Sequence, residues 1–139
     1  MRAVRPAAWR RAVATGVVAA CALGSSACFN TARSASEKMT RACGDYAKAV
    51  EADSRTTYRQ QVAEAQRWTH HAAKQDGSLK AMKIAFDKIL LDVQHPNRKG
   101  RDVVEVQNAI ERAVSGCDSF ADATTRNRIH VAVSSKSFT

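Results

Sequence analysis

The 139-residue sequence is poor in the residues that interrupt helices and in those that fill large cores. It contains two prolines, six glycines and 6% aromatic residues, whereas 45% of its residues are apolar and many of these are alanine. Alanine has the highest helix propensity and proline the lowest, so this balance favours helices over sheets. The length leaves room for one domain with one core. The composition therefore predicts a small all-α domain.

Motifs that mark common active sites are also missing. The sequence has no Gly-x-Ser-x-Gly nucleophile elbow and no glycine-rich phosphate loop. Asp87 and Asp92 are five residues apart, a spacing that does not place two carboxylates on one face of a helix. His70 and His71 are adjacent and point about 100° apart on a helix, whereas a helical zinc pair needs i, i+4 spacing and a third ligand. We therefore expect no enzyme, no metal site and no cofactor.

No acidic residue precedes Glu37, and the chain begins with a basic segment followed by a short apolar one. Four arginines stand in the first eleven residues, an apolar run covers residues 12–23, and small residues follow at 24–27. A stable membrane-spanning helix needs about 20 apolar residues, so this run is too short. The order is typical of a secretory signal peptide. We predict a signal peptide at residues 1–27 and an extracellular location or one on the outer face of the cytoplasmic membrane.

The net charge of +9 overstates how basic the exported part is. The chain has 22 Lys and Arg against 13 Asp and Glu, and four of the arginines belong to residues 1–27. Without these four, 18 basic residues remain and the net charge is +5. A charge of this size suits solubility or weak attraction to anionic surfaces.

Two cysteines stand where bacterial lipoproteins carry their lipidated cysteine. Residues 18–21, Val-Ala-Ala-Cys, resemble a lipobox, in which an aliphatic and two small residues precede the cysteine. Residues 25–28, Ser-Ser-Ala-Cys, resemble it less closely and also fit a small-x-small site for ordinary signal peptidase. The resemblance covers residues 1–28 and implies a lipid on Cys21 or Cys28, with the membrane as partner and residues 28–33 as a tether. Plain secretion is the alternative.

Cys43 and Cys117 remain in every processed form of the chain. An even pair of cysteines in an exported protein predicts a disulfide. If Cys28 is lipidated, no thiol is left free, whereas lipidation of Cys21 leaves Cys28 unpaired. The better lipobox and the simpler cysteine count thus favour different residues.

Apolar residues recur at helical spacing in four stretches of residues 34–124. Candidate N-cap residues precede the four stretches: Ser34 with Glu37, Asp53 or Ser54, Ser78, and Asp102 with Glu105. The second helix should stop at Gly77 and the third before Pro96. Residues 125–139 lose this spacing and alternate as a short strand would at 129–133, where a single strand has no partner, so we expect a tail.

Residues 34–76 contain no proline, and one long helix through them is an alternative to two. That helix would leave Cys43 roughly 50 Å from the level of Cys117, at 1.5 Å per residue. A disulfide needs Cα atoms within about 7 Å, so the long helix and the disulfide exclude each other. A break near Asp53 instead predicts an up-down-up-down four-helix bundle closed by one disulfide.

The densest basic stretch outside the signal peptide is the turn before the fourth helix. Its cations Arg98, Lys99 and Arg101 are candidates to contact phosphate groups of an anionic polymer or of lipid headgroups. The ordinary alternative is a solvated turn, which is the more frequent case. We do not expect nucleic acid as a partner.

These features together indicate a non-catalytic, exported or membrane-tethered helical interaction module. Its partner would be an envelope protein or an anionic polymer, neither of which the sequence identifies. The alternative is a carrier of a small ligand in the cell envelope, for haem or a metal, that uses Tyr or His between helices.

Overall fold

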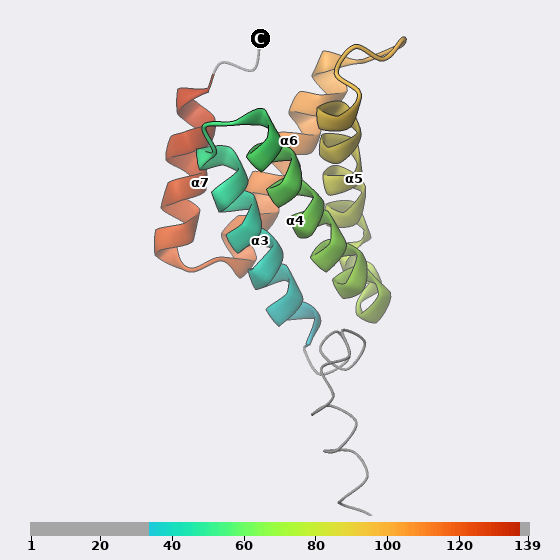
Figure 1. Cartoon of the computed structure of the whole chain (residues 1–139). Coiled ribbons are helices and arrows are strands. Elements are labelled where there is room, and N and C mark those ends of the chain that lie inside the picture. Colours follow the sequence, from blue (N-terminus) through green and yellow to red (C-terminus); the bar gives the residue numbers. More distant parts are fainter. Residues whose placement is uncertain (1–33, 137–139) are drawn as a thin grey trace, which may run out of the picture. The chain divides into compact units, whose positions relative to one another are not determined.

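The computed structural model describes residues 34–136, and these residues form a helical bundle (Figure 1). Its elements, in chain order, are α3 (Ala35–Glu51), α4 (Arg55–Gln75), the 3-10 turn η1 (Gly77–Leu79), α5 (Lys80–Gln94), α6 (Val103–Phe120) and α7 (Ala123–Ser135). No strand occurs in this part of the chain. The all-α prediction is confirmed, with five α-helices in place of four.

Side-chain caps fix most of the helix starts. Ser34 and Glu37 form the predicted capping box, in which each side chain accepts a hydrogen bond from the other residue's amide at 3.1–3.2 Å. Ser54 caps α4 by accepting from the Thr57 amide at 3.1 Å. An Asx or Ser side chain at this position satisfies an amide that the first helical turn leaves free.

The predicted Ser78 cap is wrong. Asp76 caps this corner instead, because its carboxylate accepts from the Ser78 amide at 2.9 Å. α5 then continues directly from η1 with no side-chain cap of its own. The two connections therefore differ: the chain makes a tight 3-10 turn here, whereas a short extended segment separates α3 from α4.

That extended segment, Ala52 to Ser54, is the break that the sequence predicted near Asp53. Ala52 and Ser54 both have β-region backbone angles, so the helical hydrogen bonds stop between Glu51 and Arg55. One continuous helix through residues 34–76 is therefore excluded.

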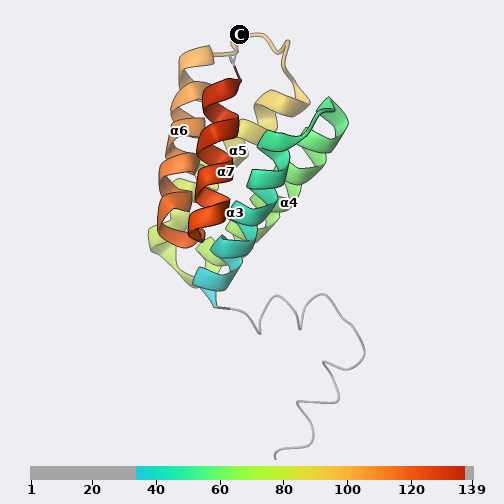
Figure 2. The same cartoon turned by 90° about the vertical axis from the view of Figure 1, so that its left-hand side faces the viewer.

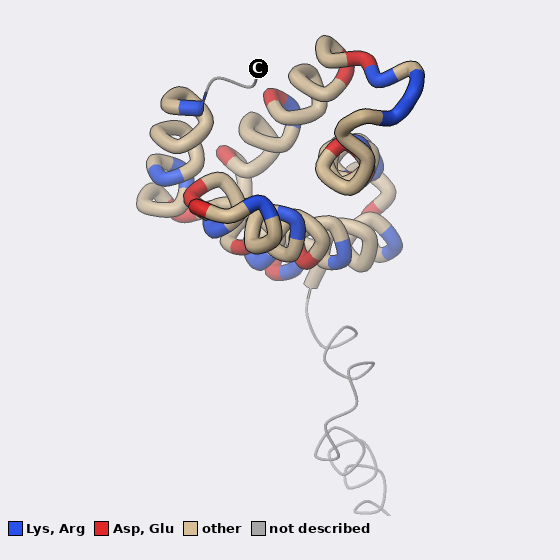
Figure 3. Tube along the Cα trace, turned by 45° about the horizontal axis from the view of Figure 1, so that its top comes forward, with Lys and Arg blue, Asp and Glu red and all other residues tan. Residues whose placement is uncertain are grey.

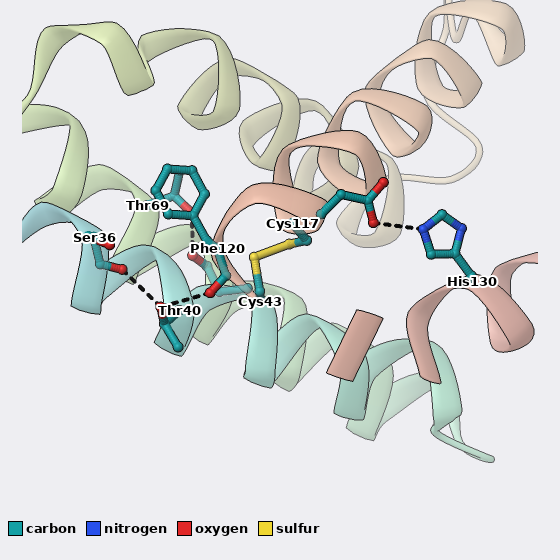
Figure 4. Close-up of a disulfide and its surroundings, with 9 residues drawn as sticks. Ser36, Thr40, Cys43, Thr69, Cys117, Phe120 and His130 are labelled. Atoms are coloured by element: carbon teal, nitrogen blue, oxygen red, sulfur yellow. Dashed lines mark hydrogen bonds and ion pairs between the residues drawn. A yellow bond between two sulfur atoms is a disulfide. The ribbon is translucent and has the colours of Figure 1, made fainter. Parts of the chain in front are cut away.

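A disulfide between Cys43 and Cys117 joins α3 to α6, as predicted. The two Cα atoms are 5.5 Å apart, and 74 positions separate the residues in sequence. Figure 4 shows two polar links near it: the Thr40 hydroxyl donates to the Phe120 carbonyl oxygen at 2.9 Å, and His130 pairs with Asp118 at 2.7 Å. Covalent and polar contacts thus hold α3, α6 and α7 together in one region.

α3 is the most buried helix, and it packs against α4, α6 and α7. Many of its buried residues are small, including Ala42, Ala47 and Ala49, which lets neighbouring backbones approach closely. Tyr46 provides its largest core side chain and meets the Phe86 ring edge-on, with the ring centroids 5.3 Å apart. The Tyr46 hydroxyl is buried and has no hydrogen-bond partner within residues 34–136.

The expected tail is wrong for residues 125–135, which belong to α7 (Ala123–Ser135), a helix that packs against both α3 and α6 (Figure 2). Asp122 caps this helix by accepting from the Thr125 amide at 2.7 Å. Ile129 is buried and Val133, one turn later, is partly buried, whereas Val131 is 61% exposed. The alternation that suggested a strand is therefore one turn of helix with its apolar side against the core.

We expect the double variant Cys43→Ser/Cys117→Ser to lose about 2–5 kcal/mol of unfolding free energy while keeping most of its helix content. The disulfide closes a long loop, which restricts the unfolded chain and should stabilise by about 4 kcal/mol in the chain-entropy model. Urea unfolding followed by circular dichroism measures the difference. The reduced wild-type protein is the control and should match the variant. An unfolding midpoint that does not change on reduction would contradict the assigned role.

Candidate functional site

The residues that the sequence singled out have different positions in the structure. Cys21 and Cys28, the candidates for lipidation, lie outside the described residues. Within residues 34–136, no group of His, Cys, Asp or Glu side chains has the arrangement of a metal site. In the same part of the chain, no helix combines the length and apolarity that crossing a membrane requires.

The basic turn is held by one carboxylate at the end of α5. Arg101 pairs with Asp92 through two hydrogen bonds, Nε to Oδ1 at 2.5 Å and Nη2 to Oδ2 at 3.0 Å. Arg98 donates to Asp92 Oδ1 at 3.1 Å. Figure 3 shows basic residues gathered on the connection between α5 and α6. Two of the three cations predicted to contact an anionic surface are thus paired within the chain, and Lys99 alone of the three lacks an ion pair among the described residues.

Asp92 is well suited to hold this turn. Its side chain is only 13% exposed, so the ion pair is shielded from solvent. Hydrogen bonds from Arg101 lower the pKa of Asp92, burial opposes this effect by raising it, and Arg98 lowers it further. Gly100 has a φ of 78°, the left-handed conformation that glycine adopts without strain, and this lets the turn fold back towards α5.

A cavity of about 330 Å³ opens beside the turn, where the ends of the helices meet. This volume lies in the lower part of the range for small-molecule sites, about 300–1,000 Å³. Six side chains form its apolar wall: Tyr58, Ile89, Val93, Val103, Val106 and Ile110. Ile89 and Ile110 are buried, whereas Val103 is 49% exposed, so the apolar wall extends from the core to the surface.

Charged side chains surround the opening of this cavity. They are Asp53, Arg55, Asp92, Arg101 and Lys136. Asp92 and Arg101 neutralise each other, as described above. Arg55, Lys136 and Asp53 make no ion pair within residues 34–136, which leaves two free cations and one free carboxylate at the opening. The charged side chains at the opening therefore have a net positive charge.

Tyr58 links the apolar wall to the charged opening. Burial, and secondarily the charge of Asp92, raises the pKa of Tyr58 to about 12, so its phenol stays protonated at neutral pH. The Lys136 ammonium lies 6.0 Å from the centre of the Tyr58 ring and donates to the Ala52 carbonyl oxygen at 3.3 Å. These contacts hold Lys136 at the cavity, and its ammonium forms no ion pair with a carboxylate within residues 34–136.

A second polar cluster lies between α4 and α5, away from the cavity. The Asp87 carboxylate lies 2.6 Å from His70 Nε2, accepts from Gln66 at 2.9 Å and accepts from Lys83 at 3.2 Å. Burial raises the pKa of Asp87, but the hydrogen bonds from these three side chains together bring it below its usual value. No hydroxyl or thiol is hydrogen-bonded to this His–Asp pair in the described residues, and the cluster links α4 to α5.

The sequence singled out neither the cavity nor the His70–Asp87 pair as a site. Tyr58, Val93 and Ile110 belong to regular apolar stripes, and such stripes predict core positions rather than a cavity wall. One feature of the sequence could have indicated part of the site. Asp92 is close in sequence to the cations of the following turn, so an ion pair between them could have been expected. The cavity itself depends on four chain segments that meet only in three dimensions.

The chain matches no protein family, no curated protein and no solved structure. The fold and site define its class in structural terms alone: a disulfide-linked all-α domain with an apolar cavity among its helix ends.

We expect Asp92→Asn to lower the unfolding free energy by roughly 1–2 kcal/mol at pH 7, because two arginines lose a shielded carboxylate. The folded carboxyl has a pKa below its usual 3.8, so the unfolded chain binds this proton more readily. The stabilisation is therefore complete above about pH 5 and is lost as the pH falls below about 4. Urea unfolding at pH 7 and pH 3 should show the gap between variant and wild type closing in acid.

The matched control is Asp53→Asn, because Asp53 is exposed and unpaired in the described structure. This variant should unfold like the wild type at both pH values. A gap between Asp92→Asn and wild type that is equally large at pH 3 would show that the lost stability does not come from the charge.

Proposed function

We propose that this protein is a non-catalytic, exported binding module whose binding site is the cavity among the helix ends. The observation that carries the proposal is a preformed cavity of about 330 Å³ with an apolar wall and a few charged groups at its opening. This combination is typical of small-molecule sites, where apolar contacts give affinity and a few polar groups give orientation. We place the site in the extracellular space or on the outer face of the cytoplasmic membrane.

The disulfide and the N-terminal sequence both support export. Disulfides form and persist in oxidising compartments and are rare in the bacterial cytoplasm. Cys43 and Cys117 are joined, and residues 1–27 have the order of a signal peptide. A lipid on Cys21 or Cys28 would tether the domain, whereas its absence would release the domain from the cell.

We also propose that α3 to α6 form an up-down-up-down bundle, with α7 as an added fifth helix. The chain order of colours in Figure 1 supports reversals between successive helices. The cavity supports it too, because its lining combines the connection after α3, the end of α5, the start of α6 and the residue after α7. α3 packs against α4, α4 against α5, α5 against α6, and α6 against α3. Each helix thus has two neighbours, as in a closed four-helix bundle.

A small organic ligand suits the cavity better than the metal or haem considered from the sequence. The residues that line it include no histidine and no cysteine, and Asp92 is already engaged by two arginines. Binding of the basic turn to an anionic polymer stays a prediction. Arg98 and Arg101 pair with Asp92, so Lys99 is the cation of this turn that has no ion pair within residues 34–136.

Export is tested by intact-mass analysis of the full chain expressed in a bacterial host. We expect a mature species in the envelope or the medium that has been cut before residue 36. A lipid-sized mass on Cys21 or Cys28 would show tethering and identify the lipobox. A cytosolic species that retains Met1 would overturn the proposed location.

The cavity is tested by nuclear magnetic resonance of the mature protein titrated with indole, a small neutral apolar probe. We expect saturable shifts at Tyr58, Val93 and Ile110, because these residues line the cavity. Val103→Phe should abolish the shifts by filling the open end, where a partly exposed side chain can grow without overpacking the core. Shifts that are spread over other surfaces, or no shifts, would overturn this binding site.

A further inference from the structure

The charges at the cavity opening restrict which ligand it favours. We propose that the cavity binds a small amphipathic anion, an apolar chain or ring that ends in a carboxylate. This inference rests on the proposed function, in which the cavity is the binding site. It adds the chemical class of the ligand and the residues that recognise it.

The volume sets the size of the apolar part. At about 30 Å³ for each water-sized group, 330 Å³ holds about eleven non-hydrogen atoms. A ten-carbon chain with a carboxylate is of this size. Larger amphiphiles would leave much of their apolar surface outside the cavity.

The gradient of burial sets the direction in which such a ligand lies. The buried side chains Ile89 and Ile110 form the inner wall, while Val103 is about half exposed at the surface. Burial of the apolar body against Ile89 and Ile110 provides the hydrophobic gain. The polar head of the ligand then lies near the charged groups of the opening.

Two cations at the opening are free to pair with that head. Arg55 is exposed and Lys136 is half-buried, and neither has a carboxylate partner within residues 34–136. Arg101 is already bound to Asp92 through two hydrogen bonds. Asp53 is the one free carboxylate of the lining, so the opening keeps a net positive charge. A ligand cation would meet repulsion here, and a neutral ligand would leave both cations unpaired.

The start of α4, where Ser54 and Arg55 line the cavity, has amides that could add to this recognition. Ser54 Oγ accepts from the Thr57 amide and Tyr58 donates its amide to the Ser54 carbonyl oxygen. The amides of Arg55 and Thr56, which precede them in the first turn, have no acceptor in the described structure. Free amides at the N-terminus of a 21-residue helix favour an anion.

The test is calorimetric titration of the mature protein with three ten-carbon probes below their micelle concentrations. The probes are decanoate, decan-1-ol and decylammonium, which each have ten carbons and differ in the charge of the head. We expect decanoate to bind roughly tenfold more tightly than decan-1-ol, as one charge-assisted hydrogen bond allows, and the ammonium to bind most weakly.

Four variants separate recognition of charge from binding of the chain. Arg55→Gln with Lys136→Gln should weaken decanoate binding by about tenfold and leave decan-1-ol unchanged. Asp53→Asn should strengthen decanoate binding by about two- to threefold, because it removes the repelling charge. Arg59→Gln is the matched control, since Arg59 is exposed on the same helix and does not line the cavity. Val103→Phe should abolish binding of both probes with an unchanged far-ultraviolet spectrum.

The outcomes distinguish this inference from the proposed function. Equal affinity for decanoate and decan-1-ol, or equal losses in Arg59→Gln and the Arg55/Lys136 variant, would overturn the anionic ligand while the cavity stays a binding site. Preference for the ammonium would overturn it in the same way. No binding of any of the three probes would overturn both.

Discussion

The covalent link between α3 and α6 is the constraint on which the rest of this small domain depends. Cys43 and Cys117 fix these two helices at a Cα distance of 5.5 Å, although most of the helical chain lies between them in sequence. α4 and α5 are the helices within this loop, and they pack in turn on α3 and α6. A core with few aromatic residues and many alanines buries limited apolar area, so a long-loop disulfide contributes a large share of the stability.

The disulfide fixes the distance between α3 and α6 at Cys43 and Cys117. The distances between the helix ends near the cavity depend on other contacts. Ala52 is nine residues beyond Cys43, and Ile110 is seven residues before Cys117, so the cavity begins roughly 10–14 Å from the disulfide at 1.5 Å per residue. Asp92 joins the turn to α5, and Glu51 joins α3 to α7 through two hydrogen bonds with Arg128 at 2.8 and 2.5 Å. Ion pairs thus link the elements around the opening, in addition to the packing of its apolar wall.

The parts of the fold that could be predicted are those that depend on residues close together in the sequence. The start of α3, the break before α4 and the end of α5 depend on neighbouring residues, and the sequence predicted all three. The disulfide followed from an even pair of cysteines and then decided between one long helix and two. α7 was missed because a single fully buried side chain, Ile129, holds most of its apolar side. Two of its other anchors, Arg128 to Glu51 and Lys136 to Ala52, span 77 and 84 positions and leave no local pattern.

The site was less predictable than the fold, because no residue type in it is diagnostic. Valine, isoleucine and tyrosine at helical spacing predict a core, and the same residues line the cavity where the helix ends diverge from full packing. The turn cations were singled out for their density, yet the carboxylate that pairs with Arg98 and Arg101 is the feature that decides their role. The two free cations of the cavity lining, Arg55 and Lys136, stand singly in the sequence, one at the start of α4 and the other after α7.

Arg55 stands at a position where a positive charge destabilises its own helix. Acidic residues are favoured in the first turn of a helix, and α3 and α6 have Glu37 and Glu105 there. α5 and α7 have no acidic residue in the first turn either, but α7 is capped by Asp122 and α5 continues from η1, which Asp76 caps. α4 has the neutral cap Ser54, no acidic residue in its first turn, and begins with an arginine. A cation at this end opposes the helix dipole at a cost of about 0.3–1 kcal/mol. Natural proteins tend to break such local rules at functional or strained sites, and a bound anion beside Arg55 would supply the charge that the first turn lacks.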